Sequence, residues 1–304
     1  MSKDYAGVFI APICPMKLDQ SIDESGLHQY LRWLLNRAEI SGLVVNVNAG
    51  EGPYLDNNER IEVISIANKC RNTNQKLVAG ICGNSTKEML LQANTAEEAG
   101  ADAVIVIPMR DWQNSRGPGH AEMLFKRLAE NTSLPLIVFQ SVSAHFDTET
   151  LLRILELPQV TAVKQAVTDI ALYQEQYSAI RSQRPDVSIL SAYDAALLPT
   201  FAIGADGVLL GIAGLLPDLV VELYNAARND QYDKARQLSL KLEPMSHYLY
   251  ALPPRSLRHI RTKAALKIMG IINSDMVREP LLPLDGIEKN KLNNAMLKAG
   301  LLSN

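Results

Sequence analysis

The residue with the clearest capacity for chemistry is a lysine at the end of a short apolar run. Lys164 follows Val160-Thr-Ala-Val163. At the carboxyl end of a strand in a parallel barrel, such a lysine would lie at the mouth, where these folds carry their chemistry. An amine held among apolar neighbours loses its proton more readily and can then attack a ketone. The alternative is a solvated lysine at a strand end, and Lys164 alone does not decide between the two.

Other polar residues also follow apolar runs. The turn Val47-Asn-Ala-Gly-Glu51 can offer backbone N–H groups and the Asn48 amide to a carboxylate, although Gly50 can equally serve only to turn the chain. Tyr193 ends one apolar stretch and His145 follows another. A histidine titrates near neutral pH, but most loop histidines are simply solvated.

The composition excludes several classes of protein. The 304 residues are 47% hydrophobic and 21% charged, with a net charge of −3 and a pI of about 6.0. We therefore expect a globular protein with no nucleic-acid partner and no membrane association. Cys14, Cys70 and Cys82 are too scattered for a disulfide framework or a metal site. With no signal-peptide pattern either, we expect a cytoplasmic location.

Short apolar runs alternate with amphipathic stretches along most of the chain. Runs buried on both faces of a parallel sheet are expected at 7–13, 42–47, 76–81, 103–107, 136–139, 160–164, 187–190 and 207–210. Helices are clearest at 24–37, 57–71, 86–99, 120–130 and 148–155. Eight such units predict a (β/α)₈ TIM barrel over 1–230. The competing doubly wound sheet has no G-x-G-x-x-G motif to support it.

Further helical sequence follows the eighth unit. It covers 232–249, 256–269 and 287–299 and is interrupted by Pro253-Pro254, Pro280 and Pro283. We expect residues 231–304 to pack on the barrel as an appended C-terminal helical layer. Arg255, Arg258 and Arg261 occur at helical spacing within it and are expected to form a solvated face or a subunit contact.

The order and spacing of many short segments resemble the dihydrodipicolinate synthase/N-acetylneuraminate lyase family of class I aldolases. The matching segments are Ala11-Pro-Ile-Cys-Pro-Met16, Gly50-Glu51 with Glu59-Arg60, Val78-Ala-Gly80, Gly100-Ala-Asp-Ala103, Leu134-Pro135, Val163-Lys164, Gly207-Val208, Lys263 and Arg278 with Pro280-Leu-Leu-Pro283. This resemblance implies that Lys164 is a Schiff-base lysine acting on pyruvate or another 2-oxo acid. It implies no cofactor or metal, and a homotetramer built as a dimer of dimers.

We expect a set of substrate-binding residues, and the chain departs from the family pattern at several of them. The set comprises Asn48, Ala49, Gly50, Glu51, Arg110, Phe139, Gln140 and Leu209. Phe139 stands where the family has a proton-relaying tyrosine, and Met109-Arg110 replaces an aromatic pair. The arginine that binds a second carboxylate in dihydrodipicolinate synthase falls near Ala144. Lysine 164 is followed by Gln165 instead of glutamate. Arg110 can bind a distal anion or be a solvent-facing loop residue.

Because Phe139 has no hydroxyl, another residue must transfer the proton during the reaction. We expect Tyr193 and His145 to be the catalytic partners of Lys164, with Ser141 and Glu51 as further candidates. Two functions remain open. One is a Schiff-base aldolase or dehydratase that is not a true dihydrodipicolinate synthase. The other is a catalytically impaired barrel that binds a 2-oxo acid or a sugar acid as a sensor or assembly partner.

Overall fold

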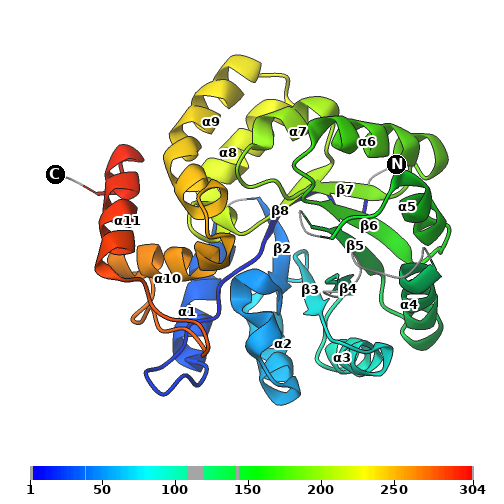
Figure 1. The fold of residues 1–304 in the computed structure, drawn as a ribbon, viewed down its shortest axis with the longest axis horizontal. Helices are drawn as coiled ribbons and strands as arrows, with labels where there is room; N and C mark the ends of the chain where they lie inside the picture. The colour runs from blue at the N-terminus through cyan, green and yellow to red at the C-terminus, as the bar shows by residue number, and fades with distance from the viewer. Residues whose placement is uncertain (1–2, 38, 109–118, 142–143, 303–304) are drawn as a thin grey trace.

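Eight parallel strands close into a barrel in the computed structural model, which describes residues 3–37, 39–108, 119–141 and 144–302. The strands are β1 (Gly7–Ile10), β2 (Ile40–Val45), β3 (Lys76–Ile81), β4 (Ala103–Val106), β5 (Leu136–Gln140), β6 (Val160–Gln165), β7 (Ser188–Ser191) and β8 (Gly207–Leu210). Each strand pairs with the next, and β8 closes the barrel on β1. The predicted TIM barrel is confirmed (Figure 1).

Eight helices alternate with these strands and surround them (Figure 1). They are α1 (Glu24–Leu35), α2 (Asn57–Cys70), α3 (Thr86–Glu98), α4 (Gly119–Asn131), α5 (Thr148–Leu155), α6 (Ile170–Gln183), α7 (Leu197–Ile203) and α8 (Pro217–Arg228). Two predicted helix starts are confirmed by their caps. The Asp147 carboxylate accepts the Thr150 N–H ahead of α5, and the Ser85 hydroxyl accepts the Glu88 N–H ahead of α3.

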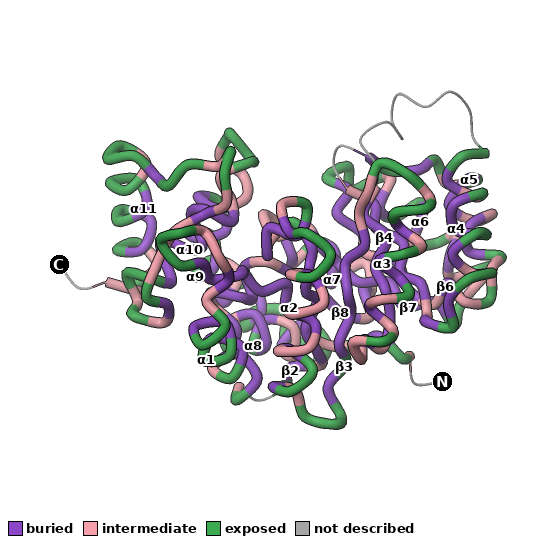
Figure 2. Tube along the Cα trace, turned by 90° about the horizontal axis from the view of Figure 1, so that it is seen from below, coloured by how far each residue is buried: buried purple, intermediate pink, exposed green. Residues whose placement is uncertain are grey.

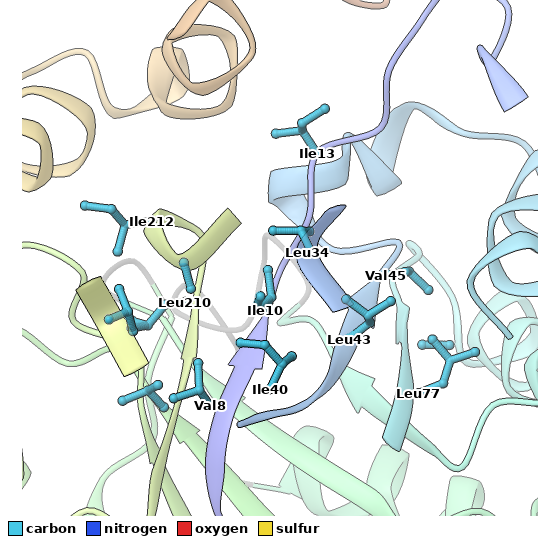
Figure 3. Close-up of a cluster of buried hydrophobic side chains, with 14 of the residues drawn as sticks. Val8, Ile10, Ile13, Leu34, Ile40, Leu43, Val45, Leu77, Leu210 and Ile212 are labelled. Carbon is cyan, nitrogen blue, oxygen red and sulfur yellow. The ribbon is translucent and has the colours of Figure 1, made fainter. Parts of the chain in front are cut away.

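Alternation along the strands divides the core into two shells. Phe9, Ile105, Ile137 and Leu209 belong to the inner cluster that fills the barrel. The residues beside them belong to the outer cluster between the strands and the helices. Figure 3 shows part of this outer shell, with Val8, Ile10, Leu43 and Leu77 among the labelled side chains. The same alternation decides which polar residues at the strand ends face the barrel mouth.

The remaining helices form a layer on one side of the barrel. They are α9 (Tyr232–Ser246), α10 (Arg258–Ile268) and α11 (Gly286–Lys298), and a π-helical turn, η4 (His247–Ala251), follows α9. In Figures 1 and 2 this layer lies on the side opposite α4 and α5. Apart from its inward side, α11 is largely exposed in Figure 2.

One expectation about this layer needs correction. Arg261 is fully buried, its guanidinium is ion-paired with Glu288, and it donates to the carbonyl oxygen of Tyr248 at 2.9 Å. It therefore belongs to no solvated face or subunit contact. On the apolar face of α10, Ile260 and Ala264 are buried within their own chain, whereas Ile268 is 43% exposed. The helix uses most of this face to dock on its own barrel.

No helix in the described part of the chain combines the length and the apolar character that crossing a bilayer requires.

Candidate active site

Lys164 lies on the inner face of β6, close to its carboxyl end. Ala162, two residues earlier, belongs to the inner cluster, while Val163 and Gln165 point outwards. Lys164 pairs in register with Phe139 of the neighbouring strand β5, and its Nζ lies 4.1 Å from the centroid of the Phe139 ring. The lysine amine is therefore held against an aromatic face at the top of the barrel interior.

The surroundings of Lys164 change its protonation. Burial lowers the pKa of the Lys164 amine from 10.5 to about 8, with Asp194 opposing this shift and Arg258 adding to it. The fraction of neutral amine at pH 7 is therefore larger than for an ordinary lysine. The site thus supplies a substantial population of nucleophilic amine.

A pocket of about 950 Å³ opens at this end of the barrel. Phe139 and Ala166 line it close to Lys164, and Tyr193 and Asp194 line it from the end of β7. The C-terminal layer contributes the side of the pocket that holds Tyr250, Arg255, Ser256, Arg258 and His259. A pocket of this volume holds a molecule considerably larger than pyruvate.

The turn after β2 reaches the pocket through Asn48, which is exposed and lines it. Asn48–Gly50 form one 3₁₀ turn, so the N–H groups of Asn48 and Ala49 have no acceptor within that turn. Ala49 packs on the inner cluster. Gly50 is buried, and a Cβ at this position would lie 3.1 Å from the carbonyl oxygen of Pro12. The turn thus combines available N–H groups with close packing beneath them.

Glu51 has a different role from the one its sequence position suggested. Its backbone has a positive φ of 57°, and its carboxylate is fully buried in an ion pair with Lys263. The same carboxylate accepts the Arg278 N–H at 2.9 Å. Glu51 therefore does not line the pocket, and it ties the β2 turn to the C-terminal layer.

Gln140 and Leu209 also lie away from the pocket lining. Gln140 is on the outer face of β5 and is fully buried, where its amide nitrogen donates to Gln165 at 2.7 Å and to Gln176 at 2.6 Å. Gln165 belongs to the same network, so its side chain and Lys164 are on opposite faces of β6. Leu209 is part of the inner cluster deep in the barrel. Strand alternation turns Gln140 and Gln165 outwards, whereas Leu209 faces the barrel interior and is covered there by the rest of the inner cluster.

The structure places only some of the predicted proton-transfer residues at the pocket. Tyr193 lines the pocket, whereas His145 is exposed and is not part of the lining. Ser141 lines the pocket, but its hydroxyl accepts the Ala144 N–H at 2.9 Å. Met109 and Arg110 lie outside the described residues.

The sequence did not identify three further pocket residues as functional groups. Asp194 accepts the Ile212 N–H at 2.9 Å, and burial raises the pKa of its carboxyl. Tyr250 comes from the π-helical turn η4, a type of distortion that is frequent at functional sites. His259 stays neutral because burial lowers its pKa to about 4. Only the position of Asp194 after an apolar strand offered a sequence signal.

Comparisons with known proteins agree with this geometry. A family model described as the dihydrodipicolinate synthetase family matches residues 4–299. The 4-hydroxy-tetrahydrodipicolinate synthase of Maridesulfovibrio salexigens is 30% identical, over 98% of this chain and 99% of the relative. The corresponding protein of Thermodesulfovibrio yellowstonii is 29% identical, over 98% of this chain and 99% of the relative.

Solved structures extend the likeness to the fold. The crystal structure of dihydrodipicolinate synthase from Thermotoga maritima superimposes with a TM-score of 0.90 at 26% identity, and the match covers 98% of this chain and 99% of that one. The barrel, the appended helices and the match over nearly the whole length all lead to one assignment. This chain belongs to the dihydrodipicolinate synthetase family, whose barrel is that of class I aldolases.

Proposed function

We propose that this protein is a lyase that forms a Schiff base through Lys164 with pyruvate or another 2-oxo acid. The observation that carries the proposal is the lysine amine on the inner face of β6, with its pKa lowered to about 8 by burial. Family membership supports a lyase, and the similar proteins described above are synthases of this family.

The chemistry follows from the neutral amine. Lys164 Nζ attacks the ketone carbon of the 2-oxo acid, and the resulting carbinolamine loses water to give an imine. Once protonated, the imine withdraws electrons from the adjacent carbon, so a carbon–carbon or carbon–oxygen bond can form or break there. The Phe139 ring, 4.1 Å from Nζ, stabilises the cationic imine through its negative face.

The substrate carboxylate fits the turn after β2. The N–H groups of Asn48 and Ala49 and the Asn48 amide supply hydrogen-bond donors. Asn48 lines the same pocket as Phe139, the residue against which the Lys164 amine lies. Lining residues Tyr193 and Asp194 are the groups we propose for proton transfer. Burial raises the pKa of the Asp194 carboxyl towards neutral pH, which suits a group that exchanges protons.

We further propose that the second substrate differs from that of the named relatives. The ring of Phe139 has no hydroxyl with which to relay a proton. Near the position where the family has a carboxylate-binding arginine, this chain has Ala144, a small buried residue that lines the pocket. The loss of a general acid–base group costs about 10²–10⁴-fold in rate. Phe139 is also what favours the second candidate, an impaired barrel that only binds a 2-oxo acid.

Trapping by borohydride tests the imine. Wild-type protein treated with pyruvate and borohydride should gain the mass of one reduced adduct on Lys164, and Lys164→Ala should gain none. Labelling of another lysine in that variant would remove Lys164 from the mechanism. A turnover assay with pyruvate and aspartate semialdehyde tests the second substrate. A rate in the ordinary enzyme range of ~1–10³ s⁻¹ would show that this chain is a true synthase.

A further inference from the structure

Arg258 is the first residue of α10, and its side chain lines the pocket from the C-terminal layer. It is half-buried, and within the described part of the chain its guanidinium has neither an ion-pair nor a hydrogen-bond partner. The other buried arginines close to the pocket and to this layer are paired. Arg60 donates to Gln92 at 2.9 Å, Arg261 is ion-paired with Glu288, and Arg278 with Glu59. Arg258 is thus a charged donor without an acceptor, next to an open cavity.

The acidic residues of the pocket do not neutralise Arg258. Burial raises the pKa of the Asp194 carboxyl, and the nearby positive charge of Arg258 opposes this rise. Asp194 accepts its hydrogen bond from the Ile212 N–H at 2.9 Å and not from Arg258. Glu88 accepts the Asn84 N–H at 3.0 Å and belongs to the start of α3. Neither forms an ion pair with Arg258.

The residues beside Arg258 reinforce its preference for an anion. Arg255, one helical turn earlier, adds a second positive charge at the exposed rim of the pocket. His259 is neutral and buried, and its Nε2 has no hydrogen-bond partner among the described residues. The Tyr250 hydroxyl stays protonated, because burial raises its pKa well above the usual value. No carboxylate of this wall competes for the guanidinium.

We propose that Arg258 binds a second carboxylate, at the far end of a dicarboxylic 2-oxo acid whose ketone reacts with Lys164. The planar guanidinium matches a carboxylate through two parallel N–H donors. A substrate held by its first carboxylate at Asn48 and Ala49 can extend past Lys164 towards α10, and the 950 Å³ pocket has room for the longer chain. This inference rests on the proposed imine at Lys164 and specifies the class of acid that it takes.

The test compares two acids on three proteins. Pyruvate has one carboxylate and 2-oxoglutarate has two, and borohydride trapping gives the half-saturating concentration of each. We expect Arg258→Gln to raise this concentration tenfold or more for 2-oxoglutarate and less than twofold for pyruvate. Arg236→Gln, which changes an exposed arginine of the same helical layer outside the pocket lining, is the matched control and should change either value less than threefold. The ratio between the acids cancels any change in the reactivity of the Lys164 amine.

Three results would overturn the subsite: an equal loss for both acids, no loss for either, or a larger loss with Arg236→Gln. Calorimetry with 2-hydroxyglutarate, which has no ketone, separates the subsite from the imine. Arg258-dependent binding of this acid in a protein that traps no imine would refute the proposed function and leave the subsite standing. Trapped imine without any dependence on Arg258 would refute the subsite alone.

Discussion

Replacing Phe139 by leucine should move the pKa of Lys164. The ring face lies 4.1 Å from Nζ and favours the protonated amine, by about 0.5–2 kcal/mol at sites that range from exposed to desolvated. Leucine keeps the amine buried but removes this attraction. Because 1.36 kcal/mol corresponds to one pKa unit, the pKa should fall by about 0.4–1.5 units, from about 8 towards 6.5–7.6.

The assay is the initial rate of borohydride-trapped imine formation with pyruvate, measured by mass spectrometry from pH 5.5 to 9.5. In wild type the rate should rise with pH through a midpoint near 8, because only the neutral amine attacks. In Phe139→Leu the midpoint should lie at lower pH. Phe139→Tyr keeps the ring face and should retain the wild-type midpoint.

Ile137→Val is the matched packing control, because Ile137 lies on the same inner face of β5, two residues before Phe139. It should cost about 0.5–1.5 kcal/mol of stability without moving the midpoint. A midpoint in Phe139→Leu that stays near 8 or rises would refute the idea that the ring acts on the charge of the amine.

Three further predictions concern stability and assembly. Glu51→Gln leaves the charge of Lys263 buried without its partner and should lower the free energy of unfolding in urea by about 3–5 kcal/mol. Arg127→Gln breaks an exposed pair with Glu130 and should lower it by less than about 1 kcal/mol. Equal losses in the two variants would contradict the structural role of Glu51. Gln176→Leu removes the shared partner of Gln140 and Gln165 and should cost about 1–3 kcal/mol by the same measurement, so an unchanged unfolding midpoint would count against that network. Sedimentation should show a homotetramer, and a protein that is only monomeric at micromolar concentration would exclude it.

Much of the fold could be read from the sequence because its signals are local. Mostly apolar runs of four to seven residues marked all eight strands, since both faces of a parallel barrel strand are buried. Helices α6, α7 and α8 were not singled out. In α6 only Tyr173, Gln176 and Ile180 are buried, and one of these is polar, so the apolar periodicity is weak. Gln176 is buried because it belongs to the amide network with Gln140 and Gln165 of the two preceding strands.

The sequence by itself predicted the positions of two parts of the candidate site: the lysine at the carboxyl end of the sixth strand and the turn after the second strand. Both depend on chain order, and a parallel barrel brings all strand ends to one mouth. Which neighbours face the same way was decided by strand alternation in three dimensions. It directed Phe139 towards Lys164 and Gln140 away from it.

Only the tertiary structure decided the far wall of the pocket. Arg258, His259 and Tyr250 are separated from Lys164 by more than 80 residues of sequence, and they reach the mouth because the C-terminal layer packs against the barrel. The buried ion pair between Glu51 and Lys263 is one contact that holds this layer against the barrel. Contacts between such distant segments depend on how whole elements dock, and no local pattern of residue types carries that information.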